Sequence, residues 1–157
     1  MNMLKSLSKR ENRKKVDGWV DVLSGDAVYN FASYADCFIS ENLIRKYIQE
    51  ESVRLSPEAQ RDIKEWKKRE KQNKRAGNIN INLRQGGDVS YLDMPGLANL
   101  ADKSRRQNSL HNDAKQYRPI RDALMHTTLL TDEAKRKLTT VYDNIKGRVM
   151  RLLSGNK

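Results

Sequence analysis

The chain has 157 residues, enough for one domain, and 37% hydrophobic against 32% charged residues predict a thin core with part of the chain solvated. A net charge of +11 favours a polyanionic partner such as nucleic acid, although a highly soluble protein with a basic tail would carry the same charge. One cysteine and two histidines exclude an intramolecular disulfide, a cysteine zinc site and a histidine metal cluster. No membrane span or secretory signal is visible, so we expect a cytoplasmic protein without metal or cofactor.

The N-terminal segment is predicted to be a basic arm, residues 1–20, followed by a helical domain, residues 21–157. Six of the first 15 side chains are basic and one is acidic, which is typical of a mobile arm or of a frayed helix that gains order on a partner. Gly18 and Gly25 are expected to turn the chain. We expect Trp19 to pack this entry segment onto the domain.

A core helix is predicted from Asp26 to about Glu51. Its apolar residues recur every three or four positions, which indicates a wide apolar face. They are Val28, Phe31, Ala32, Ala35, Phe38, Ile39, Leu43, Ile44, Tyr47 and Ile48. Cys37 lies among them and is expected to be a buried, inert thiol.

A basic helix is predicted next, with Ser56 as its cap, Pro57 at its first position and Gly77 at its end. Few of its residues are apolar, so its second half should project into water. Its positive charge indicates either a solvated face or RNA backbone contact. The candidate RNA-binding residues are Lys64, Lys67, Lys68, Arg69 and Lys71. The basic helix extension and a polar loop occupy residues 67–90, where alternating Asn and Ile have no partner strand and predict an extended loop.

Three further helices are predicted in the C-terminal half. A short one starts near Pro95, a second spans about 112–127 with Pro119 starting or kinking it, and the last begins after the cap Thr131. The last helix carries one regular apolar stripe: Ala134, Leu138, Val141, Ile145, Val149 and Leu152. The sequence therefore predicts an all-α fold, an antiparallel bundle of four to five helices.

The stretch "YRPIRDALMHTTLLTDEAKRKL", residues 117–138, holds the candidate catalytic residues Arg121, Asp122 and His126. Asp122 and His126 lie four apart on one helical face, and Arg121 is offset from His126 by roughly 140°. Histidine exchanges a proton near neutral pH, and arginine suits a phosphate. Chance spacing in a basic chain, a histidine at a helix end and a surface pair of Asp122 with Arg118 are the structural alternatives.

The same stretch resembles the HEPN superfamily (higher eukaryotes and prokaryotes nucleotide-binding). Its members carry an R-x4-6-H signature, often with Asn, Asp or His after the arginine, at the end of one helix before another long helix. The resemblance is strongest over residues 117–150 and looser through the predicted core helix. It implies a HEPN-like helical bundle that forms a homodimer, with the two motifs facing each other across a cleft.

The resemblance further implies a metal-independent endoribonuclease in a toxin–antitoxin, phage-defence or RNA-processing setting. His126 would act as general acid or base, Arg121 would hold the scissile phosphate, and Asp122 would orient them. Arg118 is a candidate RNA contact or a solvent-exposed residue. Two other readings stay open. One is a non-catalytic HEPN module that binds nucleic acid, a nucleotide, an antitoxin or a larger defence or ATPase complex; the other is an unrelated nucleic-acid-binding helical protein.

Overall fold

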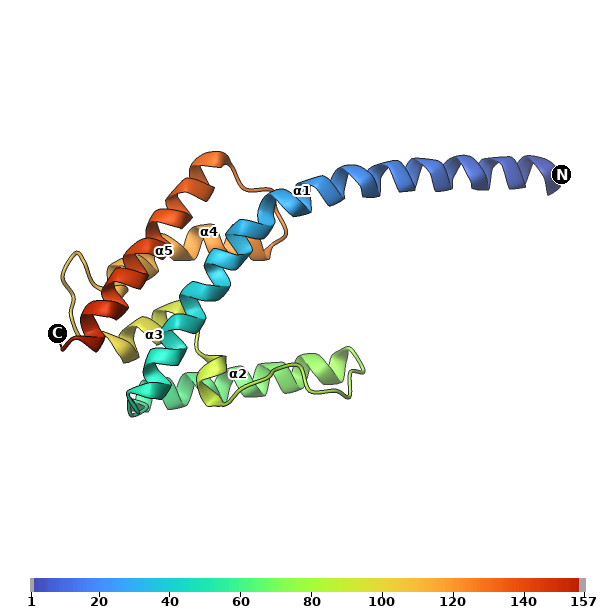
Figure 1. Cartoon of the computed structure of the whole chain (residues 1–157). Helices are drawn as coiled ribbons and strands as arrows, with labels where there is room; N and C mark the ends of the chain where they lie inside the picture. Colours follow the sequence, from blue (N-terminus) through green and yellow to red (C-terminus); the bar gives the residue numbers. More distant parts are fainter. Residues whose placement is uncertain (1, 156–157) are drawn as a thin grey trace.

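The computed structural model of the chain consists of helices joined by loops (Figure 1). It describes residues 2–155, with side chains from residue 8 onward. Met1 of the predicted arm and residues 156–157 of the predicted helical domain lie outside the described residues. The elements are α1 (Asn2–Glu50), α2 (Pro57–Ala76), the 3-10 turn η1 (Asp88–Tyr91), α3 (Met94–Ala101), α4 (Leu110–Met125) and α5 (Asp132–Leu153). No strand occurs between residues 2 and 155, and the prediction of an all-α fold is confirmed.

The core lies where the second half of α1 packs against α3, α4 and α5. We call this part of the molecule the body. The predicted stripe of α5 is buried in it from Leu138 to Leu152, with Ala134 at its edge. Each fully buried aliphatic side chain of this kind contributes roughly 1.5–3 kcal/mol. None of the helices in the described part combines the length and apolar character that crossing a membrane requires.

The predicted turn at Gly18 and Gly25 is wrong, because α1 continues through both glycines as one helix of 49 residues. A glycine inside a helix costs roughly 1 kcal/mol relative to alanine, yet it keeps its backbone hydrogen bonds and does not stop the helix. The predicted packing of Trp19 is also wrong, since its side chain is 57% exposed. Residues 2–28 form a projection that leaves the body, which we call the α1 projection (Figure 1).

The predicted apolar face of the core helix is only partly buried. Ile44 and Ile48 lie in the core, whereas Phe31 and Phe38 are more than half exposed. Val28 and Ile39 are exposed as well. The physical reason is that α1 meets the body along one narrow side, so a wide apolar face cannot be covered by one contact. The inward side of α1 also holds two buried serines, Ser33 and Ser40.

The ends of α2 are as predicted. Ser56 Oγ accepts a hydrogen bond from the N–H of Ala59 at 3.2 Å, Pro57 is the first helical residue, and Gly77 caps the other end. Only Ala59 and Ile63 are buried, so residues 64–76, the α2 projection, extend into solvent (Figure 1). The expected extended loop returns beside this helix, and Arg84 and Tyr91 both bond the Glu70 carboxylate.

A buried ion pair joins α5 to the segment between α3 and α4. Arg148 donates to both carboxylate oxygens of Asp102, at 2.7 and 2.8 Å. Asp102 also accepts from the backbone N–H groups of Ser104 and Leu110, at 3.0 and 2.9 Å. Burial raises the pKa of Asp102, but these hydrogen bonds outweigh it and hold the pKa below its ordinary value. The pair fixes the start of α4, which positions the candidate site at its other end.

Candidate functional site

The end of α4 carries the three candidate catalytic residues. Asp122 lies in its last turn, Arg121 directly precedes that turn, and His126 follows as the residue that caps the helix. The backbone N–H of His126 donates to the carbonyl oxygen of Asp122 at 3.0 Å, and the residue is exposed. These residues therefore stand at the end of one helix and before another long helix, α5, as the predicted helix bounds place them.

The two threonines after the histidine turn the chain. Thr127 has a left-handed backbone with φ of 60°, and its hydroxyl donates to the carbonyl of His126 at 2.7 Å. Thr128 donates to the carbonyl of Ala123 at 2.6 Å. These local bonds satisfy carbonyl groups that the helix end leaves without partners. Both hydroxyls therefore bond backbone carbonyls at the helix end, and His126 lies at the start of a turn with defined hydrogen bonds.

Arg121 is held by a carboxylate from another helix. Its Nε lies 3.5 Å from Oε1 of Glu41 on α1, and its Nη1 lies 3.6 Å from the Asp122 carboxylate. Asp122 also lies 3.8 Å from the guanidinium of Arg118. The Arg121 side chain is nevertheless 38% exposed, so part of the guanidinium remains open to solvent. The arginine is positioned without being sealed off.

Glu41 is the residue on which this cluster depends, and the sequence reading missed it. Its side chain is 13% exposed, and it accepts hydrogen bonds from the Tyr117 hydroxyl at 2.9 Å and from Arg45 at 3.0 Å. The signal was present, because Glu41 falls between Cys37 and Ile44 on the buried side of α1. A carboxylate in that position needs positive or hydrogen-bonding partners.

Tyr117 is almost completely buried and hydrogen-bonds the carboxylate that lies beside Arg121. Its hydroxyl lies 3.3 Å from the carbonyl oxygen of Cys37 as well as close to Glu41. Burial first and then the Glu41 charge raise the pKa of Tyr117 far above its ordinary value, so the phenol stays protonated and acts as a donor. Burial also raises the pKa of the Cys37 thiol to about 11, in keeping with the predicted buried, inert cysteine.

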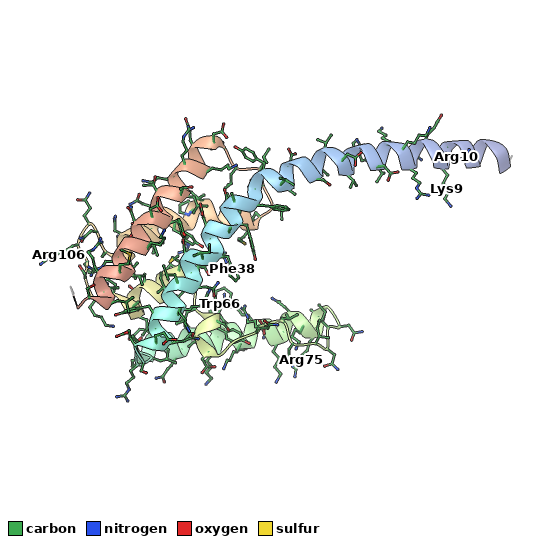
Figure 2. All side chains as sticks on the ribbon, in the orientation of Figure 1. Lys9, Arg10, Phe38, Trp66, Arg75 and Arg106 are labelled. Carbon is green, nitrogen blue, oxygen red and sulfur yellow. The ribbon has the colours of Figure 1, made fainter. Side chains whose placement is uncertain are left out.

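A groove of about 520 Å³ opens over this cluster. It lies between α1, α2, the end of α4 and residues 84–95, and Arg121, Asp122 and Arg118 line it. Its other arginines are Arg45 and Arg84, and its aromatic residues are Tyr34, Phe38, Trp66, Tyr91 and Tyr117. Figure 2 labels Phe38 and Trp66 on the two helices that border the groove. Met125 is a lining residue but His126 is not, so the imidazole stands just outside the rim.

The candidate RNA-binding residues lie along the α2 projection. All five, from Lys64 to Lys71, are exposed. Lys67 forms an ion pair with Asp88, and Arg69 lies 3.2 Å from Glu65. Of the five, Arg69 lies over the Trp66 ring, 5.1 Å from its centroid, and Trp66 lines the groove.

Among the side chains of residues 8–155, no three His, Cys, Asp or Glu lie close enough together to hold a metal ion. Comparison of the chain with protein-family models, with curated proteins and with solved structures found no match.

Proposed function

We propose that the chain is a metal-independent endoribonuclease of the HEPN type, which binds RNA in the groove and cleaves it at the end of α4. The observation that carries the proposal is the placement of Arg121. Glu41 and Tyr117 fix the guanidinium at the wall of an arginine-lined groove, and its exposed part faces any phosphate that enters. The R-x4-H spacing to an exposed histidine supports the same chemistry.

Each residue then has a defined role. A base removes the proton of the ribose 2′-hydroxyl, the 2′-oxygen bonds to phosphorus, the bond to the 5′-oxygen breaks, and an acid protonates that oxygen. His126 supplies the base or the acid. Arg121 holds the phosphate and stabilises its growing charge, and Asp122 orients Arg121. The products end in a cyclic 2′,3′-phosphate and a 5′-hydroxyl.

One imidazole cannot be base and acid at the same moment, so the proposal includes a homodimer in which two copies of the motif meet. His126 is suited to this because it is exposed at the rim, outside the groove of its own chain. Lys64, Lys68 and Lys71 would extend the contact with the RNA backbone, since exposed ammonium groups release counterions from phosphates. A cytoplasmic toxin–antitoxin or phage-defence system is the setting we propose.

One observation favours a second candidate, a HEPN module that binds RNA, a nucleotide or a protein without cutting. Arg121 lies between two carboxylates, Glu41 and Asp122, which offset part of its charge. An arginine held in this way can serve the structure of the groove as well as a phosphate. The two candidates differ in whether the chain cleaves the RNA that it binds.

The test is cleavage of an end-labelled single-stranded RNA by the purified chain, with and without a chelator. The wild type should cut in both conditions, and end-group analysis should find cyclic phosphate. Arg121→Ala should lower the rate by roughly 10²–10³, and His126→Ala by roughly 10²–10⁴. Arg136→Ala on the exposed face of α5 and His111→Ala at the start of α4 are matched controls that should keep full activity.

Binding without cleavage by the wild type, measured by fluorescence anisotropy, would replace the nuclease with the binding module. Equal activity of Arg121→Ala and its control would remove the groove from the proposal. Circular dichroism of each variant verifies that its helices are intact.

A further inference from the structure

The groove over the motif exposes aromatic side chains that the proposed cleavage step does not use. Tyr34 and Phe38 of α1 line it with 53% and 56% exposure, and Trp66 of α2 lines it with 39% exposure. Tyr34 and Phe38 form a tilted pair whose ring centroids are 6.3 Å apart. Figure 2 shows Phe38 on α1 and Trp66 on α2. Aromatic rings from two helices that remain exposed in one concave surface are typical of a ligand-binding groove.

Two of the aromatic rings lie against arginines. The guanidinium of Arg69 lies 5.1 Å from the centroid of the Trp66 ring, and that of Arg84 lies 4.6 Å from the centroid of the Tyr91 ring. Tyr91 and Arg84 are both lining residues of the groove. Arg84 also donates to the carbonyl oxygen of Ser90 at 3.1 Å, which fixes its position. This wall of the groove therefore combines aromatic rings with positive charge.

The carboxylates of the groove are already engaged within the chain. Among the described residues, the lining contains four arginines and three carboxylates: Arg45, Arg84, Arg118, Arg121, Glu41, Asp93 and Asp122. Asp93 caps α3, and Glu41 and Asp122 lie 3.0–3.8 Å from arginine nitrogens. Arg118 keeps 67% of its side chain exposed, and Arg121 keeps 38%. Both guanidinium groups therefore remain accessible to an anion that enters, although a carboxylate lies beside each.

A nucleotide matches this combination of rings and arginines. Its base offers a flat face that stacks on aromatic side chains, and its phosphate is a ligand of guanidinium groups. In a duplex both faces of a base are covered by neighbouring bases, so stacking on the protein requires an unpaired base. An acidic peptide is the rival occupant; it would meet the arginines, but its charged side chains would not cover the aromatic rings. The groove volume of about 520 Å³ lies within the range of roughly 300–1,000 Å³ that ligand pockets have.

We propose that Phe38 and Trp66 bind the face of an unpaired base of the RNA, beside the phosphate that Arg121 holds. This inference rests on the proposed binding of RNA in the groove, and it adds the side chains that select the substrate. Phe38 precedes Glu41 by three positions, so the two lie on neighbouring turns of α1, and Glu41 lies 3.5 Å from Arg121. Because every base has a flat face, the site selects unpaired over paired RNA and distinguishes little among the four bases.

The first test uses the two tryptophans of the chain as reporters of ligand position. Trp19→Phe leaves Trp66 of the groove as the only indole, and Trp66→Phe leaves Trp19, which is exposed on the α1 projection and does not line the groove. The probe is a short single-stranded oligonucleotide of 2′-O-methyl RNA, which lacks the 2′-hydroxyl that cleavage requires. It should quench the fluorescence of Trp66 by stacking and leave that of Trp19 unchanged. An unchanged Trp66 signal at the highest probe concentration overturns the inference, and so does a larger change at Trp19 than at Trp66.

The second test measures the affinity for a dye-labelled form of the same probe by fluorescence anisotropy. Phe38→Ala should weaken binding about 5- to 100-fold, as the loss of one stacked base does. Phe31→Ala is the matched control and should bind like the wild type, since Phe31 is 61% exposed on the same helix and does not line the groove. A duplex of the same sequence and inorganic polyphosphate should compete only weakly. Equal competition by either of them, or by an acidic peptide of equal charge, overturns the inference.

Neither test depends on cleavage, because the probe cannot be cut and neither Phe38 nor Trp66 supplies a proton. A chain that binds the probe through Phe38 but cuts no RNA keeps this inference and loses the proposed nuclease. A chain whose Phe38→Ala variant cuts RNA as fast as the wild type at every RNA concentration keeps the nuclease and loses this inference. Circular dichroism of each variant verifies that its helices are intact before either comparison is made.

Discussion

The body and the α1 projection are built on opposite principles although they share one helix. In the body, residues such as Ile44 and Leu138 are fully buried, and the polar groups Asp102 and Arg148 are paired. In the projection, Trp19 and Leu23 face solvent and the helix is held by its own backbone hydrogen bonds. The comparison teaches that helical structure alone does not show where a chain is stable; burial does.

The largest effect should come from breaking the buried ion pair of the body. Asp102→Ala leaves Arg148 without its carboxylate in a buried place, and we expect a loss of about 3–5 kcal/mol in the free energy of unfolding. Urea denaturation followed by circular dichroism measures it. The control is Asp88→Ala, which removes the exposed partner of Lys67 and should change stability by less than about 1 kcal/mol.

The Asp102–Arg148 pair should also make the stability of the body depend on pH. The native pKa of Asp102 lies below its ordinary value, so the group stabilises the fold above an unfolded pKa of about 3.9. That contribution is lost as the pH falls through the lowered native pKa. Asp102→Ala should therefore flatten the acid limb of the stability curve, and an unchanged acid limb would show that other carboxylates govern it.

The next effect compares one leucine in each region. Leu138→Ala, at a fully buried position, should destabilise the chain by about 2–5 kcal/mol. Leu23→Ala, at a 62% exposed position, should change the stability of the dilute monomer by less than about 0.5 kcal/mol. Thermal unfolding of both variants at one low concentration is the measurement. Equal losses would mean that the projection packs on the body in solution.

A smaller effect is expected where the body meets the candidate site. Tyr117→Phe removes the hydroxyl that donates to Glu41, which should cost about 1–2 kcal/mol. If the enzyme proposal holds, the same change should lower the cleavage rate, because Arg121 loses a fixed counter-charge. Tyr142→Phe is the control, since its hydroxyl makes no hydrogen bond within the described residues. Chemical denaturation and the RNA assay separate the two consequences.

The smallest effect on stability is expected in the α1 projection. Gly25→Ala adds a methyl group where nothing lies within 4 Å, and it should raise helicity and stabilise the segment by about 0.5–1 kcal/mol. In the body, Gly96→Ala brings its Cβ to 3.3 Å from the Asp93 carboxylate that caps α3, so no gain is expected. Hydrogen exchange of the projection measures the difference.

Features set by neighbouring residues could be predicted from the sequence. The Ser56 cap, the Thr131 cap and the stripe of α5 each depend on a few adjacent positions. The continuation of α1 through Gly18 and Gly25 could not be predicted by counting breakers, because the cost of a glycine is small compared with what a long helix tolerates.

Contacts between distant segments were beyond a local reading. Glu41 and Arg121 are 80 positions apart, and Asp102 and Arg148 are 46 apart. In each pair the carboxylate, Glu41 or Asp102, becomes largely buried only when the helices pack. The position of the motif at a helix end was visible in the sequence. Glu41 was visible as a carboxylate among buried positions of α1, but its pairing with Arg121 was not.

The unbroken course of α1 has a mechanical meaning. A helix of 49 residues rises by about 1.5 Å per residue and spans roughly 70 Å, without a joint between its free end and Glu41. A partner that binds near that end would be joined to Glu41, the carboxylate beside Arg121, by one continuous helical backbone.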